Sequence, residues 1–469
     1  MKVNEFNKKK VYSEGSGVCA VVDDRIEMVL NDFGIYEEKV NASLDSELSP
    51  LVEIVSPNLN NKINESTIAS KLYKNIDSMK YDEKIGYYKS LYVGHVSEDN
   101  FRMDGSSGGM GTWILKELFD NNLIDGVIHV KENKDLNSPI LFRYDISYSI
   151  DEIKKGAKTK YYPVEFSKVI NTVKEKPGRY AIVGIPSFIM AIRLLAENDE
   201  TIRERIKFTI GLICGHQKSS KVAEAFGWQV GFKPGDLRHI DFRAKLPGRN
   251  SSNYGVKMDG LINGERKSII KPIAELIGDN WGEGYFKVRA SDFTDDVMNE
   301  TADITLGDAW LPEYTNDSLG NNVIIIRNPE IDILVKNAMK NGKLKMDVVD
   351  KDVIIKSQAA HYRHTRDELS YRLYKKDKSK EWRPQKRVQA SNNLPYFRKI
   401  IQHLREEISM RSHTIYKEAI ELDDFEYFRK EIQKLSKKYK RVYFYMTIKD
   451  KGVKGIIRAI KRRISRKDN

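Results

Sequence analysis

Cysteine is the scarcest chemically useful residue in this sequence of 469 residues, which contains only Cys19 and Cys214. Two thiols cannot build a disulfide framework. Long apolar runs are also missing, because no window approaches the roughly 18 uncharged apolar residues that a membrane-spanning helix needs. The N-terminal residues MKVNEFNKKK lack the apolar core of a signal peptide. These absences predict a cytoplasmic protein that does not span a membrane.

Positive charge is concentrated near one end of the sequence. The formal net charge is +13, and residues 451–469 supply +7 of it through eight lysines and arginines against one aspartate. Apolar and basic residues recur there at helical spacing, which predicts an amphipathic helix. This helix either contacts the anionic inner face of a membrane or packs on protein. The remaining positive charge is dispersed and no recognised nucleic-acid module is present, so we expect no nucleic-acid partner.

Composition predicts a globular chain with several units. Hydrophobic residues make up 40% and aromatic residues 10% of the sequence, enough to form buried cores. We expect a small N-terminal unit over residues 1–40 and a ligand-binding α/β unit over 41–330. A helical segment with a charged linker follows over 331–393, and a helical C-terminal extension over 394–469. In the N-terminal unit, the apolar run 18–22 is a candidate short strand.

One arrangement occurs three times between residues 88 and 228: an apolar stretch, a turn of small residues and a helical pattern. The stretches YKSLYVGHV, RYAIVGIP and FTIGLIC lead into turns at residues 104–109, 184–187 and 215–220. This alternation predicts an α/β fold, with a mixed sheet flanked by helices. Ligands of such folds collect where the carboxyl ends of strands meet helix N-termini.

The first turn contains a candidate anion cradle made of Ser106, Ser107, Gly108 and Gly109. The first turn of a helix presents unpaired amides and a positive dipole end, and glycine lets a phosphate approach the backbone. We therefore predict a phosphate or pyrophosphate site, although serine and glycine that merely cap the helix would give the same pattern. The stretch matches neither the Walker loop nor the GxGxxG signature.

Several cationic residues are also site candidates. His216 lies at an expected helix start, where the dipole would lower its pKa and favour a neutral ring that accepts a proton; a structural cap is the alternative. Arg243 and Lys245, beside a Pro-Gly turn, suit an anionic ligand but also a solvated loop. Lys160 is either an anion contact or a surface lysine.

The stretch over residues 292–314, DFTDDVMNETADITLGDAWLPEY, combines many carboxylates with a strand-like run and a turn. Such a density of acids first indicates a catalytic or metal site. The stronger candidates within it are Asp303, Gly307 and Asp308, where the strand-like run ends in the turn.

Six motifs of the sequence, taken in order, resemble a single family. They are SSGG at 106–109, TKYYP at 159–163, GIPSF at 184–188, CGHQKS at 214–219, FRAK at 242–245 and DDVMNETADITLGDAW at 295–310. The family is that of the beta subunits of the hydrogenases and dehydrogenases of coenzyme F420, a deazaflavin, and the resemblance covers roughly residues 11–325. It implies an iron-sulfur flavoprotein that uses FAD to pass electrons to or from a substrate. It also implies that residues 1–40 are the remnant of a ferredoxin-like segment.

The cysteines that the resemblance implies as cluster ligands are largely replaced. The family's C-x-G-C-G-x-C stretch corresponds to residues 13–19, where only Cys19 remains. The ligands of its second cluster correspond to Ser187, Cys214, Ser291 and Thr294. Protein-bound clusters need about four thiolates, and a serine hydroxyl is a harder and far less acidic donor. We predict no iron-sulfur cluster and no metal site; a cluster shared with another chain is the alternative.

Two functions from different classes follow. The first is a cluster-free, FAD-dependent oxidoreductase that acts on a small molecule. Because cysteine-poor relatives of this type resemble proteins of bacterial surface-polysaccharide synthesis, the resemblance implies a role in that synthesis. Its predicted cofactor-binding residues are Ser106, Ser107, Gly108, Gly109, Lys160, Gly184, Pro186, Gly215, Arg243 and Lys245. Its predicted catalytic residues are His216, Asp308 and Lys160. The second is a non-redox transferase or ligand-binding protein that reuses the former cofactor pocket.

Overall fold

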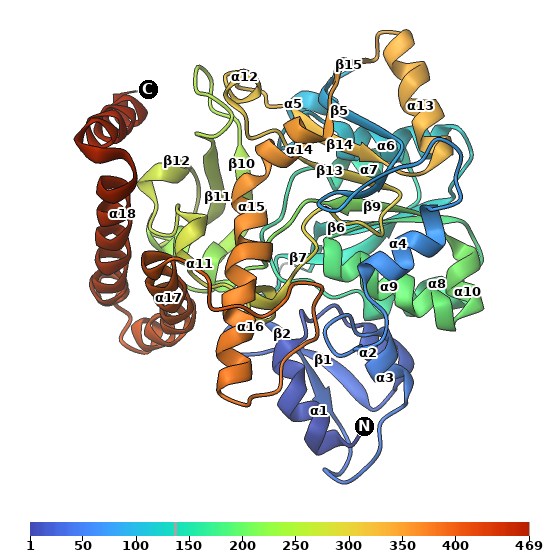
Figure 1. Ribbon diagram of the computed structural model, residues 1–469, viewed down its shortest axis with the longest axis horizontal. Coiled ribbons are helices and arrows are strands. Elements are labelled where there is room, and N and C mark those ends of the chain that lie inside the picture. The colour runs from blue at the N-terminus through green and yellow to red at the C-terminus, as the bar shows by residue number, and fades with distance from the viewer. Residues whose placement is uncertain (136–137, 469) are drawn as a thin grey trace.

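An eight-stranded mixed sheet forms the centre of the structure, a computed structural model that describes the backbone of residues 1–135 and 138–468 and the side chains as far as residue 449 (Figure 1). The strand order is β15-β5-β14-β13-β9-β8-β6-β7. The strands are β5 (Ser90–Val96), β6 (Gly126–Glu132), β7 (Phe142–Ser147), β8 (Tyr180–Gly184), β9 (Ile206–Leu212), β13 (Ile304–Asp308), β14 (Asn322–Ile326) and β15 (Leu344–Val348). The predicted α/β class with a mixed sheet is confirmed.

Strand direction decides where a ligand can bind. Four neighbouring strands are parallel: β6, β8, β9 and β13. Strand β14 is antiparallel to both β13 and β5, so β5 runs in the same direction as these four. The carboxyl ends of these strands therefore meet at one edge of the sheet. The three predicted strand-turn-helix repeats are present, with α6 (Met110–Asp120), α9 (Pro186–Asn198) and α11 (Lys221–Trp228) as their helices.

Helices cover both faces of the sheet, and neighbouring strand residues alternate between them. Val127 and Ala181 face a core that contains α6 and α13 (Pro329–Lys340). Ile128 and Ile182, one position further along, face a core that contains α8 (Ser167–Glu175) and α9. This period of two explains why these strands are apolar at nearly every position, since both of their faces are buried.

The N-terminal unit consists of short helices and one hairpin, packed against α8 and α9. Its elements are α1 (Val3–Lys9), α2 (Val18–Val22), β1 (Ile26–Leu30), β2 (Tyr36–Val40) and α3 (Leu51–Val55). The prediction of a strand over residues 18–22 is wrong. Gly17 takes a left-handed conformation with φ 88° and begins a helical turn that buries Val18 and Cys19. A five-residue apolar run has no periodicity that separates a strand from a helix, so its packing neighbours decide.

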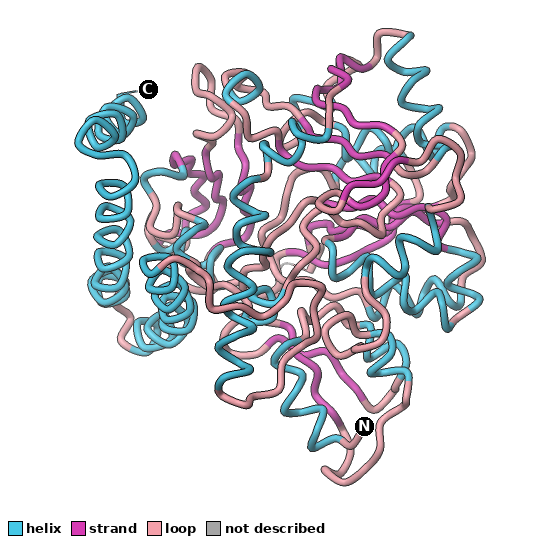
Figure 2. The backbone as a smooth tube through the Cα atoms, viewed as in Figure 1, coloured by secondary structure: helices cyan, strands magenta, loops and turns pink. Residues whose placement is uncertain are grey.

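The C-terminal part of the chain forms a second core. A three-stranded antiparallel sheet, β10 (Leu237–Ala244), β11 (Gly255–Ile262) and β12 (Glu265–Pro272), packs with α11 and the helices α17 (Tyr396–Glu421) and α18 (Phe425–Asp468). Figure 2 shows these helices beside the sheet-bearing body. Helix α18 includes the predicted amphipathic tail, whose side chains lie outside the described residues. No helix in the described part of the chain is long and apolar enough to cross a membrane.

The α/β unit continues past the expected boundary at residue 330, because β15 supplies an edge strand of the main sheet. The expected linker over 371–393 begins inside α16 (Glu368–Lys378) and then crosses back to the N-terminal unit. Arg387 anchors this crossing: its Nη1 donates to both carboxylate oxygens of Glu300 at 2.9 Å, and its backbone N–H donates to Asp295 at 2.9 Å.

Arg387 thereby neutralises most of the acidic cluster noted in the sequence. Asp295, Asp296 and Glu300 are all buried. Asp295 has its pKa lowered by Lys386 and Arg387 although burial opposes the shift, whereas burial and the neighbouring Glu300 raise the pKa of Asp296 to about 7. This cluster is a charge network that holds the C-terminal crossing in place.

We predict that Asp296→Asn increases stability more at about pH 8 than at about pH 5. The pKa of Asp296 is raised to about 7 in the folded state, so the free energy of unfolding decreases as the pH rises toward 7. Asparagine does not ionise, so Asp296→Asn removes this decrease. A difference of about 1–2 kcal/mol between the two pH values is expected in urea unfolding. The matched variant Asp295→Asn, which deprives Arg387 of a charged partner, should destabilise the protein at both pH values. Equal effects of Asp296→Asn at both pH values would contradict the prediction.

Candidate functional site

A cavity of about 300 Å³ lies at the carboxyl edge of the main sheet. That volume is at the lower end of the roughly 300–1,000 Å³ typical of small-molecule sites. The ends of β8, β9 and β13 form its floor through Gly184, Leu212 and Asp308. Tyr144 and Phe188, whose rings stack with centroids 6.1 Å apart, provide an aromatic wall. The position agrees with the rule that ligands of α/β sheets bind outside the strand carboxyl ends.

The N-terminus of α6 opens onto this cavity. Gly109 precedes the helix with φ 88°, and Gly111 and Thr112 in its first turn line the cavity. Gly108 packs so tightly that an added Cβ would lie 2.6 Å from the Asn322 Oδ1 atom. Glycine at this position lets α6 approach β14 closely. The backbone amides of a helix's first turn have no intrahelical partners. The Met110 N–H already donates to Asn322 Oδ1 at 3.1 Å, so the amides of Gly111 and Thr112 are the ones that can receive an anion.

The serine hydroxyls of the predicted cradle are already engaged within the protein. The Ser106 hydroxyl oxygen accepts from the Thr159 backbone N–H at 2.7 Å, and the Ser107 hydroxyl donates to the Asn321 carbonyl at 3.0 Å. Both residues line the cavity. The groups that remain for a phosphate are therefore the helix amides, and the phosphate site itself stays a prediction.

A buried Arg243 and a partly buried Asp308 form an ion pair at the cavity floor. Arg243 Nη1 donates to Asp308 Oδ2 at 2.7 Å, and its guanidinium lies over the Tyr254 ring at 4.3 Å. Asp308 lines the cavity, whereas Arg243 stands behind it and orients its carboxylate. Of the other two candidates in this stretch, Gly307 lines the cavity too. Asp303 instead accepts from Arg193 at 3.0 Å and from the Thr209 backbone N–H at 2.8 Å, inside the fold.

The two candidate lysines are occupied by backbone carbonyls. Lys160 Nζ donates to the carbonyls of Gly156, Ala157 and Lys158 at the end of α7 (Ile150–Lys155), and burial lowers its pKa to about 8. Lys245 Nζ donates to the carbonyls of Arg102 and Ser107. Lys160 still contributes to the cavity wall.

His216 lines the cavity and is neutral, but not for the expected reason. Its pKa is lowered well below the usual value first by burial, then by the charges of Lys218 and Lys287. The helix α11 begins only at Lys221, five positions later, so the helix dipole is not the main cause. Pro186 begins α9 behind Gly184, and Gly215 packs against the His361 ring, with an added Cβ 3.0 Å from His361 Cδ2.

A carboxylate occupies the place where the resemblance implies the second cluster. The hydroxyls of Ser291 and Thr294 donate to Glu14 Oε1 at 2.9 and 3.2 Å, and the Ser187 hydroxyl donates to Glu14 Oε2. The charge of Glu14, after burial, also raises the pKa of Cys214 to about 12. A thiol held protonated beside a carboxylate and hydroxyls is a poor ligand set for iron, so these residues do not fit a cluster. In the described residues, no group of three or more His, Cys, Asp or Glu side chains is arranged to hold a metal.

Sequence reasoning missed three residues of this region: Glu14, Gln217 and Lys218. Glu14 gives no signal of its own in the sequence, because it lies inside a stretch whose clearest feature is the missing thiols. Gln217 and Lys218 belong to the CGHQKS motif and line the cavity. A lysine in a turn of small and polar residues, directly after an apolar strand, was the signal that could have found the latter.

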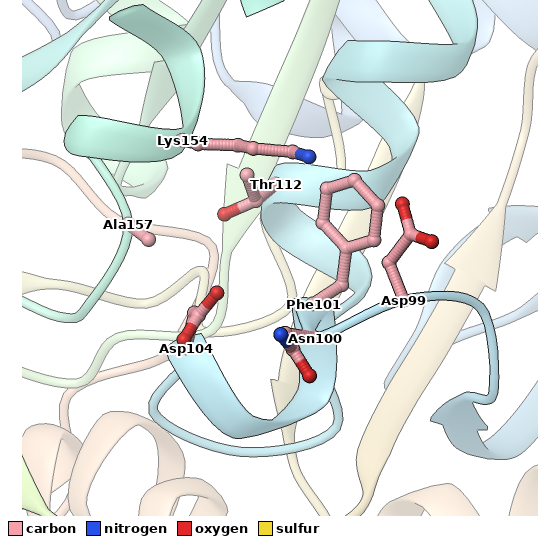
Figure 3. Close-up of a pocket in the computed structure, with 7 residues that line it drawn as sticks. All are labelled: Asp99, Asn100, Phe101, Asp104, Thr112, Lys154 and Ala157. Atoms are coloured by element: carbon pink, nitrogen blue, oxygen red, sulfur yellow. The ribbon is translucent and has the colours of Figure 1, made fainter. Parts of the chain in front are cut away.

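A second hollow of about 260 Å³ adjoins the cavity, with which it shares Thr112 and Ala157 (Figure 3). The short helix α5 (Phe101–Asp104) and the loop before it line one side of the hollow, and Lys154 of α7 lies over the Phe101 ring at 4.9 Å. Its lining is mostly polar and accessible, so we assign it no function.

The fold and the cavity define an α/β protein with a cavity at the carboxyl ends of its parallel strands. The model of the N-terminal part of the coenzyme F420 hydrogenase/dehydrogenase beta subunit matches residues 91–171, and that of the C-terminal part matches residues 178–352. The chain belongs to this family of beta subunits, as the motifs predicted, and is therefore related to oxidoreductases.

Individual relatives are distant and cover only part of the chain. One subunit of the F(420)H(2) dehydrogenase of Methanosarcina mazei is 29% identical over 123 residues, which are 26% of this chain and 33% of that protein. An uncharacterized protein of Methanocaldococcus jannaschii is 27% identical over 217 residues, 39% of this chain and 59% of that protein. A chain of the F420-reducing NiFe hydrogenase complex from Methanosarcina barkeri has a TM-score of 0.47 and 15% identity, covering 67% of this chain and 99% of that chain. The chain thus spans about a third and about three fifths of the two curated relatives.

We predict that Glu14→Ala destabilises the protein by about 2–4 kcal/mol, because the hydroxyls of Ser187, Ser291 and Thr294 lose their acceptor. Glu14→Gln retains one acceptor oxygen and should cost less than half as much. Urea unfolding of the two variants measures both effects. A change within about 0.5 kcal/mol for Glu14→Ala, the range of an ordinary surface substitution, would show that the carboxylate does not organise this region.

Proposed function

We propose that this protein is a flavin-dependent oxidoreductase of a small molecule that works without an iron-sulfur relay. One observation supports this proposal most. At the same strand edge, the cavity keeps an aromatic wall and open helix amides, while Glu14 takes the hydrogen bonds of Ser187, Ser291 and Thr294. The residues suited to a flavin are therefore kept, and those suited to a cluster are replaced.

The residues of the cavity suit FAD. The amides of Gly111 and Thr112, at the positive end of α6, would bind its phosphates, and the absence of side chains at Gly109 and Gly111 allows close approach. Tyr144 and Phe188 offer a flat apolar wall to a ring system. FAD would supply transfer of electrons in pairs, which requires no cluster.

The polar residues of the cavity would position substrate and handle protons. His216 is neutral because burial and neighbouring cations lower its pKa, so it can accept a proton at neutral pH. Asp308, fixed by Arg243, would orient the substrate through a hydrogen bond. Lys160 would shape the wall, since its ammonium group already donates to backbone carbonyls.

We predict that the purified protein shows the visible absorption of an oxidised flavin or acquires it when FAD is added. Gly111→Val should weaken FAD binding at least about tenfold. Gly111 and Leu306 both line the cavity, and a Cβ at position 111 would have Leu306 as its only neighbour, at 3.9 Å. The valine side chain therefore fits without a clash and takes up space in the cavity that the cofactor would need. Fluorescence titration with FAD measures the affinity.

Gly227→Ala in α11 is the matched control: its new Cβ would contact Leu237 at 3.4 Å, away from the cavity, and binding should be unchanged. If FAD binds neither the native protein nor the control, the flavin proposal fails and the non-redox transferase or ligand-binding function takes its place.

We also propose that the basic segment over residues 451–469 contacts an anionic membrane surface. The support is its charge of +7 together with a helical backbone as far as Asp468. Anionic lipid attracts each lysine or arginine near the surface by roughly 1 kcal/mol. Such contact suits work on surface polysaccharides at the inner membrane face, a role that stays a prediction from the resemblance.

Co-sedimentation with lipid vesicles tests this contact. The full chain should bind vesicles that contain phosphatidylglycerol, and a chain truncated after Lys449 should bind at least about tenfold more weakly. Binding should fall as salt is added, because the charges are screened. Equal binding of both chains, or binding to neutral phosphatidylcholine vesicles of equal strength, would contradict the proposal.

A further inference from the structure

Four residues at or beside the cavity carry buried polar atoms that the fold does not fully use. They are His216, Gln217 and Lys218, which line the cavity, and His364, whose ring lies 6.1 Å from that of His216. We call these four residues the cationic recess. His364 belongs to a π-helical turn, η5 (Arg363–Asp367), a local distortion that occurs frequently at functional sites.

Lys218 is a buried lysine that forms no ion pair among the described residues, and burial followed by the nearby charges of Lys287 and Arg405 lowers its pKa well below the usual value. Its residue is 3% exposed, its ammonium donates to the Tyr285 carbonyl, and it lies 5.0 Å over the Trp281 ring. Among the described residues, no carboxylate lies within ion-pair distance of it. Because an ammonium has three donors, two of them are left without a protein acceptor.

The neighbouring cations do have partners, which makes Lys218 the exception. An isolated antiparallel backbone bridge joins Lys218 and Lys287, so their side chains are neighbours. Lys287, unlike Lys218, forms an ion pair with Asp292. Arg405 of α17 donates to Glu368 at 2.5 Å. Glu283, the carboxylate whose charge favours the protonated form of Lys218, forms its ion pair with Lys440. The acids here are thus matched to other cations, and an anion bound beside Lys218 would favour its protonated form.

The other members of the recess also lack hydrogen-bond partners. His216 Nε2, Gln217 Nε2 and both ring nitrogens of His364 are buried without a partner in the described residues. The Glu368 carboxylate is 3.9 Å from His364 Nδ1, too far for a hydrogen bond. Burial and nearby cations lower the pKa of both histidines, so each is a neutral ring with one N–H to donate.

An unpaired ammonium surrounded by unused N–H donors is complementary to an oxyanion. Water could satisfy the donors but would not compensate a charge on Lys218, so burial favours the neutral amine until an anion binds. A neutral or cationic ligand group would leave that charge uncompensated as well.

We infer that the cationic recess binds the carboxylate or phosphate group of an anionic substrate, whose remainder extends into the main cavity. The inference rests on the proposed function, which places electron transfer in the main cavity. It adds that the substrate is an anion. It also gives the C-terminal part of the chain a role in recognition, because His364 lies beyond residue 352, where the family match ends.

Thermal unfolding with small anions tests the inference. Inorganic phosphate, acetate and the neutral acetamide are the probes, at constant ionic strength and without added flavin. Phosphate or acetate should raise the Tm of the native protein and acetamide should not. A larger response to phosphate identifies a phosphorylated substrate, and a larger response to acetate identifies a carboxylic one.

Lys218→Met should weaken the anion response at least about tenfold, as expected for loss of a charge-assisted hydrogen bond. Lys221→Met, which removes a lysine paired with Glu224, should respond like the native protein.

The anion-free proteins provide a second measurement. Lys218→Met should have a Tm equal to or above that of the native protein, because it removes a buried amine whose charge has no partner. Lys287→Met should have a lower Tm, because it leaves Asp292 without its closest cation. His364→Leu should retain its Tm and lose part of the anion response.

Equal anion responses in the native protein and Lys218→Met would show a general salt effect and overturn the inference. A lower Tm for Lys218→Met together with an unchanged anion response would assign Lys218 a structural role only. Because flavin is absent from the assay, failure here is distinct from failure of the flavin titration.

Discussion

The hydrogen bonds to the Glu14 carboxylate join the N-terminal unit to the strand edge that carries the cavity. Ser187 lies in the first turn of α9, and Ser291 and Thr294 precede β13, so the Glu14 side chain connects its own segment with these two. The resemblance implies cysteines at the positions of these hydroxyls. Carboxylate and hydroxyls together form an ordinary hydrogen-bond network, which holds the same segments without a metal.

Buried charge is handled in two ways in this protein. Around Arg387, the acids Asp295 and Glu300 are neutralised by a cation from the distant C-terminal crossing, and the result is mechanical: it fastens that crossing to the body. Lys218, in contrast, lines a cavity and forms no ion pair among the described residues, so a charge on it has no partner until an anion binds. Since uncompensated buried charge is costly, we connect the first arrangement with structure and the second with binding.

Much of the fold follows from local patterns. The strand-turn-helix repeats could be predicted because β8 is apolar throughout, β9 is apolar at most positions, and turns of small residues or proline precede their helices. The cavity's position follows from these repeats, and Ser106, Gly109, Gly184, His216 and Asp308 all line it. The run 18–22 was wrongly predicted as a strand and the edge strand β15 was not predicted, because short segments adopt the structure that their neighbours allow.

Sequence alone determined the family, the α/β class and the loss of the cysteine ligands, because each depends on residue types in a fixed order along the chain. Tertiary structure decided what the residues do. It directed the Lys160 ammonium to backbone carbonyls, placed Glu14 among the hydroxyls, and brought His364 beside His216. Residues 14 and 291, or 216 and 364, are far apart in sequence, and only the packing of the folded chain sets their burial, partners and charge.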